Sequence, residues 1–147
     1  MSVHVVNLSQ SDLQKQVEQT VLNILGETRP DGLLYAPKPL VLGLVEDAGY
    51  IGGLVGSTNF GYLHVSLLAV APSSHGKGYG RQLMQAAENE ALARGCHGAY
   101  LDTFSFQAPD FYQKLGYEIY GKLDDFPKGH CRYFLRKKLC NFLGKAE

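Results

Sequence analysis

The feature that most constrains the fold is a glycine-rich turn between an apolar run and an amphipathic helix. Residues 63–70 are almost wholly apolar, which is typical of a strand buried on both faces of a sheet. Glycines then alternate with other residues over 76–80, and apolar residues follow at helical spacing until Gly95. Residues 98–104 are a second apolar run. The order strand, turn, helix, strand predicts a crossover connection, which makes the two strands parallel.

The remaining segments predict mostly antiparallel strands around this unit. Residues 40–46 and 50–58 flank an Asp-Ala-Gly turn and are expected to form a hairpin. The other expected elements are a short strand at 3–7, a helix over 13–25 after a capping-box spacing from Ser11 to Gln14, a loop over 27–37, a short helix at 109–115, and strands at 117–123 and 131–139. The sequence predicts an α+β fold with a mixed, mostly antiparallel central sheet and one domain over residues 1–147.

Composition argues against several classes of protein. Lys and Arg together number 14, as do Asp and Glu, so bulk charge does not favour binding to nucleic acid or to a membrane. No run approaches the roughly 18 apolar residues of a membrane span, and the N-terminus lacks signal-peptide features. The 3 cysteines form no CxxC pair, which favours reduced thiols and a cytoplasmic location. The 5 histidines lack metal-ligand spacing, so no metal is expected.

The glycine-rich turn is a candidate phosphate site. The first N–H groups of a helix have no intrahelical partner and carry the positive end of the helix dipole. Glycines let the backbone approach an anion, and His75, Lys77 and Arg81 could add charge or hydrogen-bond donors. The turn is not a P-loop, and its GxGxG spacing differs from the GxGxxG of dinucleotide-binding folds. The alternative is a tight turn that binds nothing.

Two segments in this order resemble the GCN5-related N-acetyltransferases, the GNAT family. The family's cofactor loop follows the six-residue pattern [RQ]-x-x-G-x-[GA]. Residues 75–80, His-Gly-Lys-Gly-Tyr-Gly, match this pattern at Gly78 and Gly80 and carry His75 at the first position, where the family has Arg or Gln. Residues 111–117, Phe-Tyr-Gln-Lys-Leu-Gly-Tyr, resemble a second family segment. The element order agrees from about residue 3 to 139. Residues 103–109 together with 127–130 also resemble an uncharacterised bacterial subgroup of acetyltransferases.

The resemblance implies where acetyl-CoA binds as co-substrate. It would lie where strands 63–70 and 98–104 splay apart, with its pyrophosphate on the N–H groups of residues 76–81. Ser105 stands where many relatives carry an Asn that contacts the cofactor. The cofactor-binding residues expected on this basis are Leu68, Ala69, Val70, His75, Gly76, Lys77, Gly78, Tyr79, Gly80, Arg81, Ser105 and Tyr112.

Tyr112 is also the expected catalytic acid. Attack of an amine on a thioester expels a thiolate, and a Tyr with a reference pKa near 10 is suited to protonate it. The alternative is a Tyr that only packs its ring. The base that accepts the amine proton is less clear: His64 is the first candidate, followed by Ser66, Glu46 and His130. A strand His that is simply hydrogen-bonded is the alternative for His64.

The sequence therefore favours an acetyl-CoA-dependent N-acetyltransferase that acts by direct transfer in a ternary complex. The acceptor would be the primary amine of a small molecule or a peptide. The rival hypotheses are a non-catalytic module that senses acyl-CoA or a nucleotide, and a pure interaction domain. By analogy with the family, a homodimer through the terminal strands is a further expectation.

Overall fold

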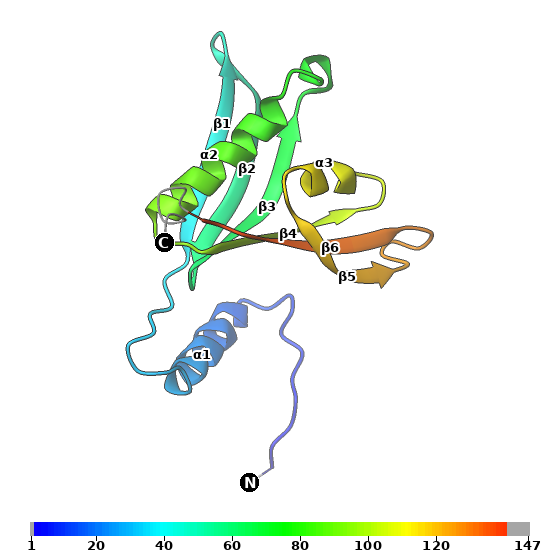
Figure 1. The fold of residues 1–147 in the computed structure, drawn as a ribbon. Helices are drawn as coiled ribbons and strands as arrows, with labels where there is room; N and C mark the ends of the chain where they lie inside the picture. Colours follow the sequence, from blue (N-terminus) through cyan, green and yellow to red (C-terminus); the bar gives the residue numbers. More distant parts are fainter. Residues whose placement is uncertain (1, 141–147) are drawn as a thin grey trace. The chain divides into compact units, whose positions relative to one another are not determined.

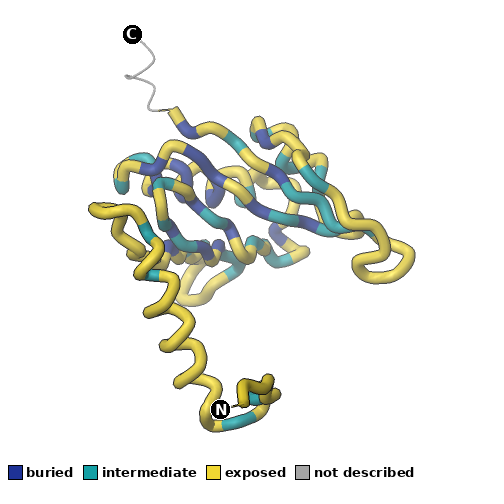
Figure 2. The backbone as a smooth tube through the Cα atoms, turned by 90° about the horizontal axis from the view of Figure 1, so that it is seen from below, coloured by how far each residue is buried: buried dark blue, intermediate teal, exposed yellow. Residues whose placement is uncertain are grey.

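Residues 2–140 are described by a computed structural model, in which the chain divides into two units, Met1–Leu34 and Tyr35–Glu147. The first unit contains helix α1, Gln14–Glu27, which has no buried side chain; Figure 2 shows its tube exposed along almost its whole length. The strand expected at residues 3–7 is wrong, because these residues form no strand. A short apolar run becomes a strand only when a second strand pairs with it, and the described part of this unit offers none.

The capping box expected before α1 is also absent. The Ser11 Oγ accepts a hydrogen bond from the backbone N–H of Leu13 at 3.1 Å, and no side chain caps the helix. The Gln14 amide instead donates to the Glu18 carboxylate at 2.9 Å, one turn further along. The helix therefore begins at Gln14, three residues after the Ser that was expected to start it.

The second unit is built on a six-stranded sheet with the strand order β1-β2-β3-β4-β6-β5 (Figure 1). Its elements are β1 Lys38–Glu46, β2 Gly49–Asn59, β3 Tyr62–Val70, α2 Tyr79–Ala93, β4 Gly98–Phe104, α3 Pro109–Lys114, β5 Glu118–Asp124 and β6 Cys131–Lys138. The β3–β4 pair is parallel and the other described pairs are antiparallel. This arrangement confirms the predicted α+β class and the parallel crossover.

Helix α2 packs across β1, β2 and β3, as Figure 1 shows. Its inner face carries Met84, Ala87 and Ala91, all essentially inaccessible to solvent. The two alanines lack bulk beyond Cβ, which lets the helix approach the sheet closely. The largest fully buried side chains of the core are Leu40, Leu54, Leu63, Met84, Leu101 and Leu135. This core fixes the start of α2 relative to the ends of β3 and β4, where the candidate site lies.

Candidate functional site

The two parallel strands at the centre of the sheet separate part-way along their length. β3 pairs with β4 only from Tyr62 to Val65, and the register with β2 shifts at the same point. This shift leaves Ser66 as an extra residue, a β-bulge that re-aims the strand. Beyond the bulge β3 pairs with β2 alone, so its edge toward β4 is open. A cleft of about 1050 Å³ occupies the space between the strands.

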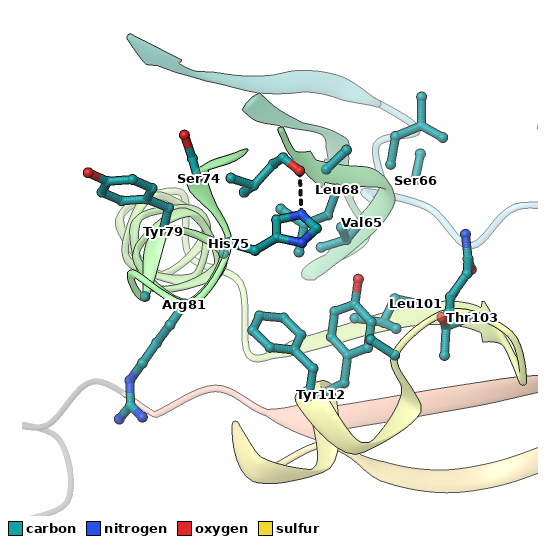
Figure 3. Close-up of a pocket in the computed structure, with 18 of the residues that line it drawn as sticks. Val65, Ser66, Leu68, Ser74, His75, Tyr79, Arg81, Leu101, Thr103 and Tyr112 are labelled. Atoms are coloured by element: carbon teal, nitrogen blue, oxygen red, sulfur yellow. Dashed lines mark hydrogen bonds between the residues drawn. The ribbon is translucent and has the colours of Figure 1, made fainter. Parts of the chain in front are cut away.

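The cleft is lined by residues from β3, the glycine-rich turn, β4 and α3. Those that line it are Val65, Ser66, Leu67, Leu68, Ala69, Val70, Ser74, His75, Gly76, Gly78, Tyr79, Gly80, Arg81, Leu101, Asp102, Thr103, Gln107, Ala108, Phe111 and Tyr112. Most of the residues expected to bind the cofactor are in this set. Figure 3 shows the turn residues at one end, Ser66 and Thr103 at the other, and Tyr112 between them.

The glycine-rich turn depends on backbone conformations that glycine adopts freely. Gly76 and Gly78 have φ angles of +78° and +79°, in the left-handed region. A Cβ built on either would meet nothing within 4 Å, so the space above the turn is open. Gly78 precedes α2 and offers no side-chain cap, which leaves the first N–H groups of the helix for an anion.

Gly80 has a different role in the same turn. A Cβ at this position would lie 3.2 Å from Cζ of Phe111 on α3, which is tighter than ordinary contact. The absent side chain therefore lets α3 approach the first turn of α2.

His75 fastens the turn to the end of β3. Its Nε2 lies 2.6 Å from the carbonyl oxygen of Val70, the contact drawn as a dashed line in Figure 3. Because a carbonyl oxygen can only accept, the Nε2 atom carries the proton in this pair. The Val70 carbonyl is thereby occupied. Because the Ala71 N–H donates to the Ile51 carbonyl on β2 and the backbone groups of a strand alternate in direction, the open β3 edge offers the backbone groups of Leu68 and the N–H of Val70.

Tyr112 projects from α3 into the middle of the cleft (Figure 3). Burial raises the pKa of its hydroxyl, and the negative charge of Asp102 raises it further. The group is therefore protonated at neutral pH and can donate a proton. Asp102 itself lines the cleft and is paired with Arg132, whose Nε and Nη2 atoms lie 2.9 Å and 2.8 Å from the same carboxylate oxygen.

A buried polar cluster holds the end of α3, and sequence reasoning missed it. The Glu88 carboxylate on α2 accepts hydrogen bonds from the Tyr117 hydroxyl and from Lys137 Nζ, both at 2.8 Å. The backbone N–H of Tyr117 donates to the carbonyl of Tyr112, and the two Tyr rings lie edge to face with centroids 6.2 Å apart. Burial and the Glu88 charge raise the pKa of Tyr117 far above its usual value, so its hydroxyl stays a donor.

Three expected site residues do not line the cleft: His64, Lys77 and Ser105. The Ser105 hydroxyl instead accepts a hydrogen bond from the backbone N–H of Cys131 at 3.0 Å. The His64 ring stacks on Tyr100 with centroids 4.6 Å apart, and its Nδ1 lies 3.5 Å from the hydroxyl of the cleft residue Ser66. The lesser base candidates Glu46 and His130 also lie outside the lining.

Other cleft residues were not singled out from the sequence. Thr103 and Gln107 line the cleft and are hydrogen-bonded to each other, Thr103 Oγ1 donating to Gln107 Oε1 at 3.1 Å. Their position at the end of the predicted strand 98–104 and in the turn that follows it is the signal that could have marked them. Among the described residues, no group of three or more His, Cys, Asp or Glu could hold a metal ion, and no helix is long and apolar enough to cross a membrane.

Comparison with known proteins identifies the family. Residues 40–119, more than half of the chain, match the model of the acetyltransferase (GNAT) domain. The chain belongs to the GNAT acetyltransferase family. The matched residues of this GNAT chain include every residue that lines the cleft. Helix α1 and strand β6 lie outside the match.

Individual relatives agree with this assignment. The GNAT chain is 42% identical over 89 residues to the blasticidin-S acetyltransferase of Streptomyces morookaense, covering 60% of this chain and 65% of that protein. It is 39% identical over 93 residues to an acetyltransferase of Agrobacterium fabrum, covering 63% of this chain and 68% of that one. The crystal structure of an acetyltransferase from Bacillus cereus superposes with a TM-score of 0.85 at 33% identity, covering 93% of this chain and 98% of that one.

Proposed function

We propose that this protein is an N-acetyltransferase that transfers the acetyl group of acetyl-CoA to a primary amine by direct attack in a ternary complex. The observation that carries the proposal is the fork between β3 and β4, where an open strand edge, the glycine-rich turn and the Tyr112 side chain face one cleft. Membership of the GNAT family supports the same reaction class.

The residues present fit acetyl-CoA. The open space over Gly76 and Gly78, beside the free N–H groups of α2, suits the pyrophosphate. The open edge of β3, formed by Leu68 and the Val70 N–H, would pair with the amides of the pantetheine arm in the manner of an added strand. Arg81 lines the same end of the cleft and adds a positive charge. Acetyl-CoA supplies the acetyl group as a thioester.

The chemistry needs one proton donor and one proton acceptor. A bond forms between the acceptor nitrogen and the acetyl carbon, the carbon–sulfur bond breaks, and the Tyr112 hydroxyl donates its proton to the departing sulfur. The nitrogen gives up a proton, for which Ser66 and His64 offer a route because their side chains lie 3.5 Å apart. The products are an N-acetylated amine and the free thiol of CoA. No cysteine is among the described residues that line the cleft, which favours direct transfer over an acyl-enzyme.

The acceptor that we propose first is the primary amine of a small antibiotic-like molecule. The support is the similarity to a protein named for its acetylation of blasticidin S. The matched region spans only 65% of that relative, so a peptide amine is the other acceptor class to be tested.

Two measurements on one sample test the proposal. Acetyl-CoA is titrated into the protein by calorimetry, and release of free thiol is then followed with blasticidin S, with simple primary amines and with an N-terminal peptide. Binding together with amine-dependent thiol release supports an acetyltransferase. Binding without release for any amine favours the sensing module, and no binding at near-millimolar acetyl-CoA overturns the proposal.

A further inference from the structure

Four aromatic side chains form a continuous surface beside the end of the cleft that lies away from the glycine-rich turn. We call Phe104, Phe106, Phe126 and His130 the aromatic platform. The rings of Phe104 and Phe106 stack with centroids 5.1 Å apart, Phe126 stacks on Phe104 at 5.9 Å, and His130 meets Phe106 edge to face at 5.1 Å. Phe106 and Phe126 are nevertheless 55% and 42% exposed. Clustered exposed aromatic area of this kind marks a surface for binding.

The platform is continuous with the cleft wall. Phe106 directly precedes Gln107, which lines the cleft. The Gln107 side-chain oxygen accepts hydrogen bonds from the Thr103 hydroxyl and the Phe104 backbone N–H, both at 3.1 Å. Thr103 lies at the end of the cleft opposite the glycine-rich turn, beyond Tyr112 (Figure 3). If the turn holds the phosphates of acetyl-CoA, the acceptor enters from the end beside the platform.

The loop that carries Phe126 and His130 is held in one shape by its own hydrogen bonds. The Phe126 N–H donates to the His130 carbonyl at 3.2 Å, and the His130 N–H donates to the Pro127 carbonyl at 2.9 Å. The Asp125 carboxylate accepts a bond from the Gly129 N–H at 3.2 Å. The rings are therefore positioned before any ligand arrives, which lowers the entropic cost of binding.

Arg132 determines what kind of group the platform accepts. Its guanidinium carbon lies 4.8 Å from the ring centroid of Phe126 and 5.4 Å from that of Phe104, so these rings already hold a cation. The Arg132 charge is paired with Asp102, and the guanidinium occupies the ring faces that a second cation would need. The exposed ring area is instead suited to a flat, uncharged ring that stacks on it.

We propose that the aromatic platform binds a planar aromatic ring of the acceptor, so the preferred acceptors are primary amines that carry an aromatic or heteroaromatic ring. The inference rests on the proposed function, because the ring is recognised as part of the acceptor. The amine itself extends from the ring into the cleft toward Tyr112.

The first test compares two amines that differ in ring shape. Thiol release is measured with 2-phenylethylamine, whose ring is flat, and with 2-cyclohexylethylamine, whose ring is puckered. Because an aromatic pair gains affinity beyond its buried area, the flat-ring amine should have a kcat/KM about tenfold higher. Phe106→Leu keeps an apolar side chain and should bring the ratio close to one. Phe60→Leu, at an exposed Phe in the β2–β3 turn, is the matched control and should keep the wild-type ratio.

A second readout does not depend on turnover. Saturation-transfer NMR records the contact of each amine with the protein in the presence of CoA. Wild-type protein should saturate the ring protons of 2-phenylethylamine more strongly than those of 2-cyclohexylethylamine, and Phe106→Leu should remove the difference. Equal signals for the two amines, or a difference that survives in Phe106→Leu, would overturn the inference. Failure of the proposed function would appear separately, as absent acetyl-CoA binding or absent thiol release with every amine.

Discussion

The two ends of the cleft differ in the chemical groups that line them. At the glycine-rich end, backbone N–H groups are open to the cleft around Gly76 and Gly78, and the side chains of Tyr79 and Arg81 lie beside them. At the far end, the wall is made of side chains: the hydrogen-bonded Thr103 and Gln107, and Asp102, which is paired with Arg132 behind it. A backbone-built site recognises a group without depending on side-chain identity, whereas a side-chain-built site changes its preference with each substitution. The first end suits a constant co-substrate and the second a variable acceptor.

Tyr112 lies between the two ends, so removing its hydroxyl should affect the chemical step and neither binding end. Tyr112→Phe keeps the ring against Phe111 and Tyr117 and should lower kcat by about 10²–10⁴-fold, the usual contribution of a general acid. Acetyl-CoA affinity measured by calorimetry should stay the same. Tyr120→Phe, at an exposed Tyr on β5, is the control. An unchanged kcat in Tyr112→Phe would remove this residue from the mechanism.

Glu88→Ala should remove the hydrogen bonds that hold the end of α3 against α2. It leaves Lys137 and the buried Tyr117 hydroxyl without their acceptor, which we expect to lower the free energy of unfolding by about 2–4 kcal/mol. Denaturant unfolding measures the loss. Glu90→Ala on the same helix removes a pair one turn apart between the exposed Glu90 and the partly buried Arg94, which should cost no more than about 0.5 kcal/mol. Equal losses in the two variants would show that the cluster does not anchor α3.

Gly78→Val should damage the glycine-rich end selectively. A β-branched residue at a φ of +79° is strained by about 1–2 kcal/mol, and its side chain would occupy the open space above the turn. Acetyl-CoA affinity should fall by about tenfold. Gly49→Val is a matched control, because a Cβ there also meets nothing within 4 Å but the φ angle is not positive. If Gly78→Val bound acetyl-CoA normally, the phosphate position would be wrong.

His64→Asn should have the smallest effect. Because Ser66 stands between His64 and the cleft, we expect kcat to fall by only about threefold to fivefold, well below the roughly 10²–10⁴-fold of a base that contacts the substrate directly. His97→Asn is the control, since that ring packs on Tyr62 rather than beside Ser66. A wild-type kcat in His64→Asn would mean that the amine loses its proton by another route.

Alkaline unfolding provides a further check on the buried cluster. The pKa of Tyr117 is raised in the folded state, so its stabilising contribution is complete below about pH 10 and is lost as the pH rises toward the folded pKa. The free energy of unfolding should therefore decline above about pH 10. Tyr117→Phe, which keeps the ring and removes the ionisable group, should make this decline shallower in denaturant titrations at several pH values.

Local sequence patterns were sufficient for the fold of residues 38–138. The turn at Asp47–Gly49 and the alternating glycines of 76–80 are local signals that mark where the flanking elements begin and end. They were therefore enough to predict β1–β4 and α2. The strand expected at 3–7 failed because a strand depends on a partner that no local pattern can supply.

The candidate site likewise contains residues that local patterns predict and contacts that they do not. The glycine-rich turn and Tyr112 are recognisable from short motifs. The Glu88 cluster joins residues 29 and 49 positions apart, and the Arg132 contact with Asp102 spans 30 positions. That contact depends on the register in which Asp102 faces Phe134 across β4 and β6. A single sequence does not fix such a register.

The bulge at Ser66 has a consequence for aggregation. An open strand edge is normally a hazard, because a strand of another molecule can add to it and start a growing assembly. Here the open edge of β3 lies in the middle of the sheet, with β4 and β6 beyond it and α3 lining the same cleft. An extended chain thin enough to enter the cleft can pair with this edge, whereas a full strand with its own neighbours has no room. The fork thus keeps an unpaired strand edge accessible to a narrow ligand, while a strand of a second protein molecule cannot add to it.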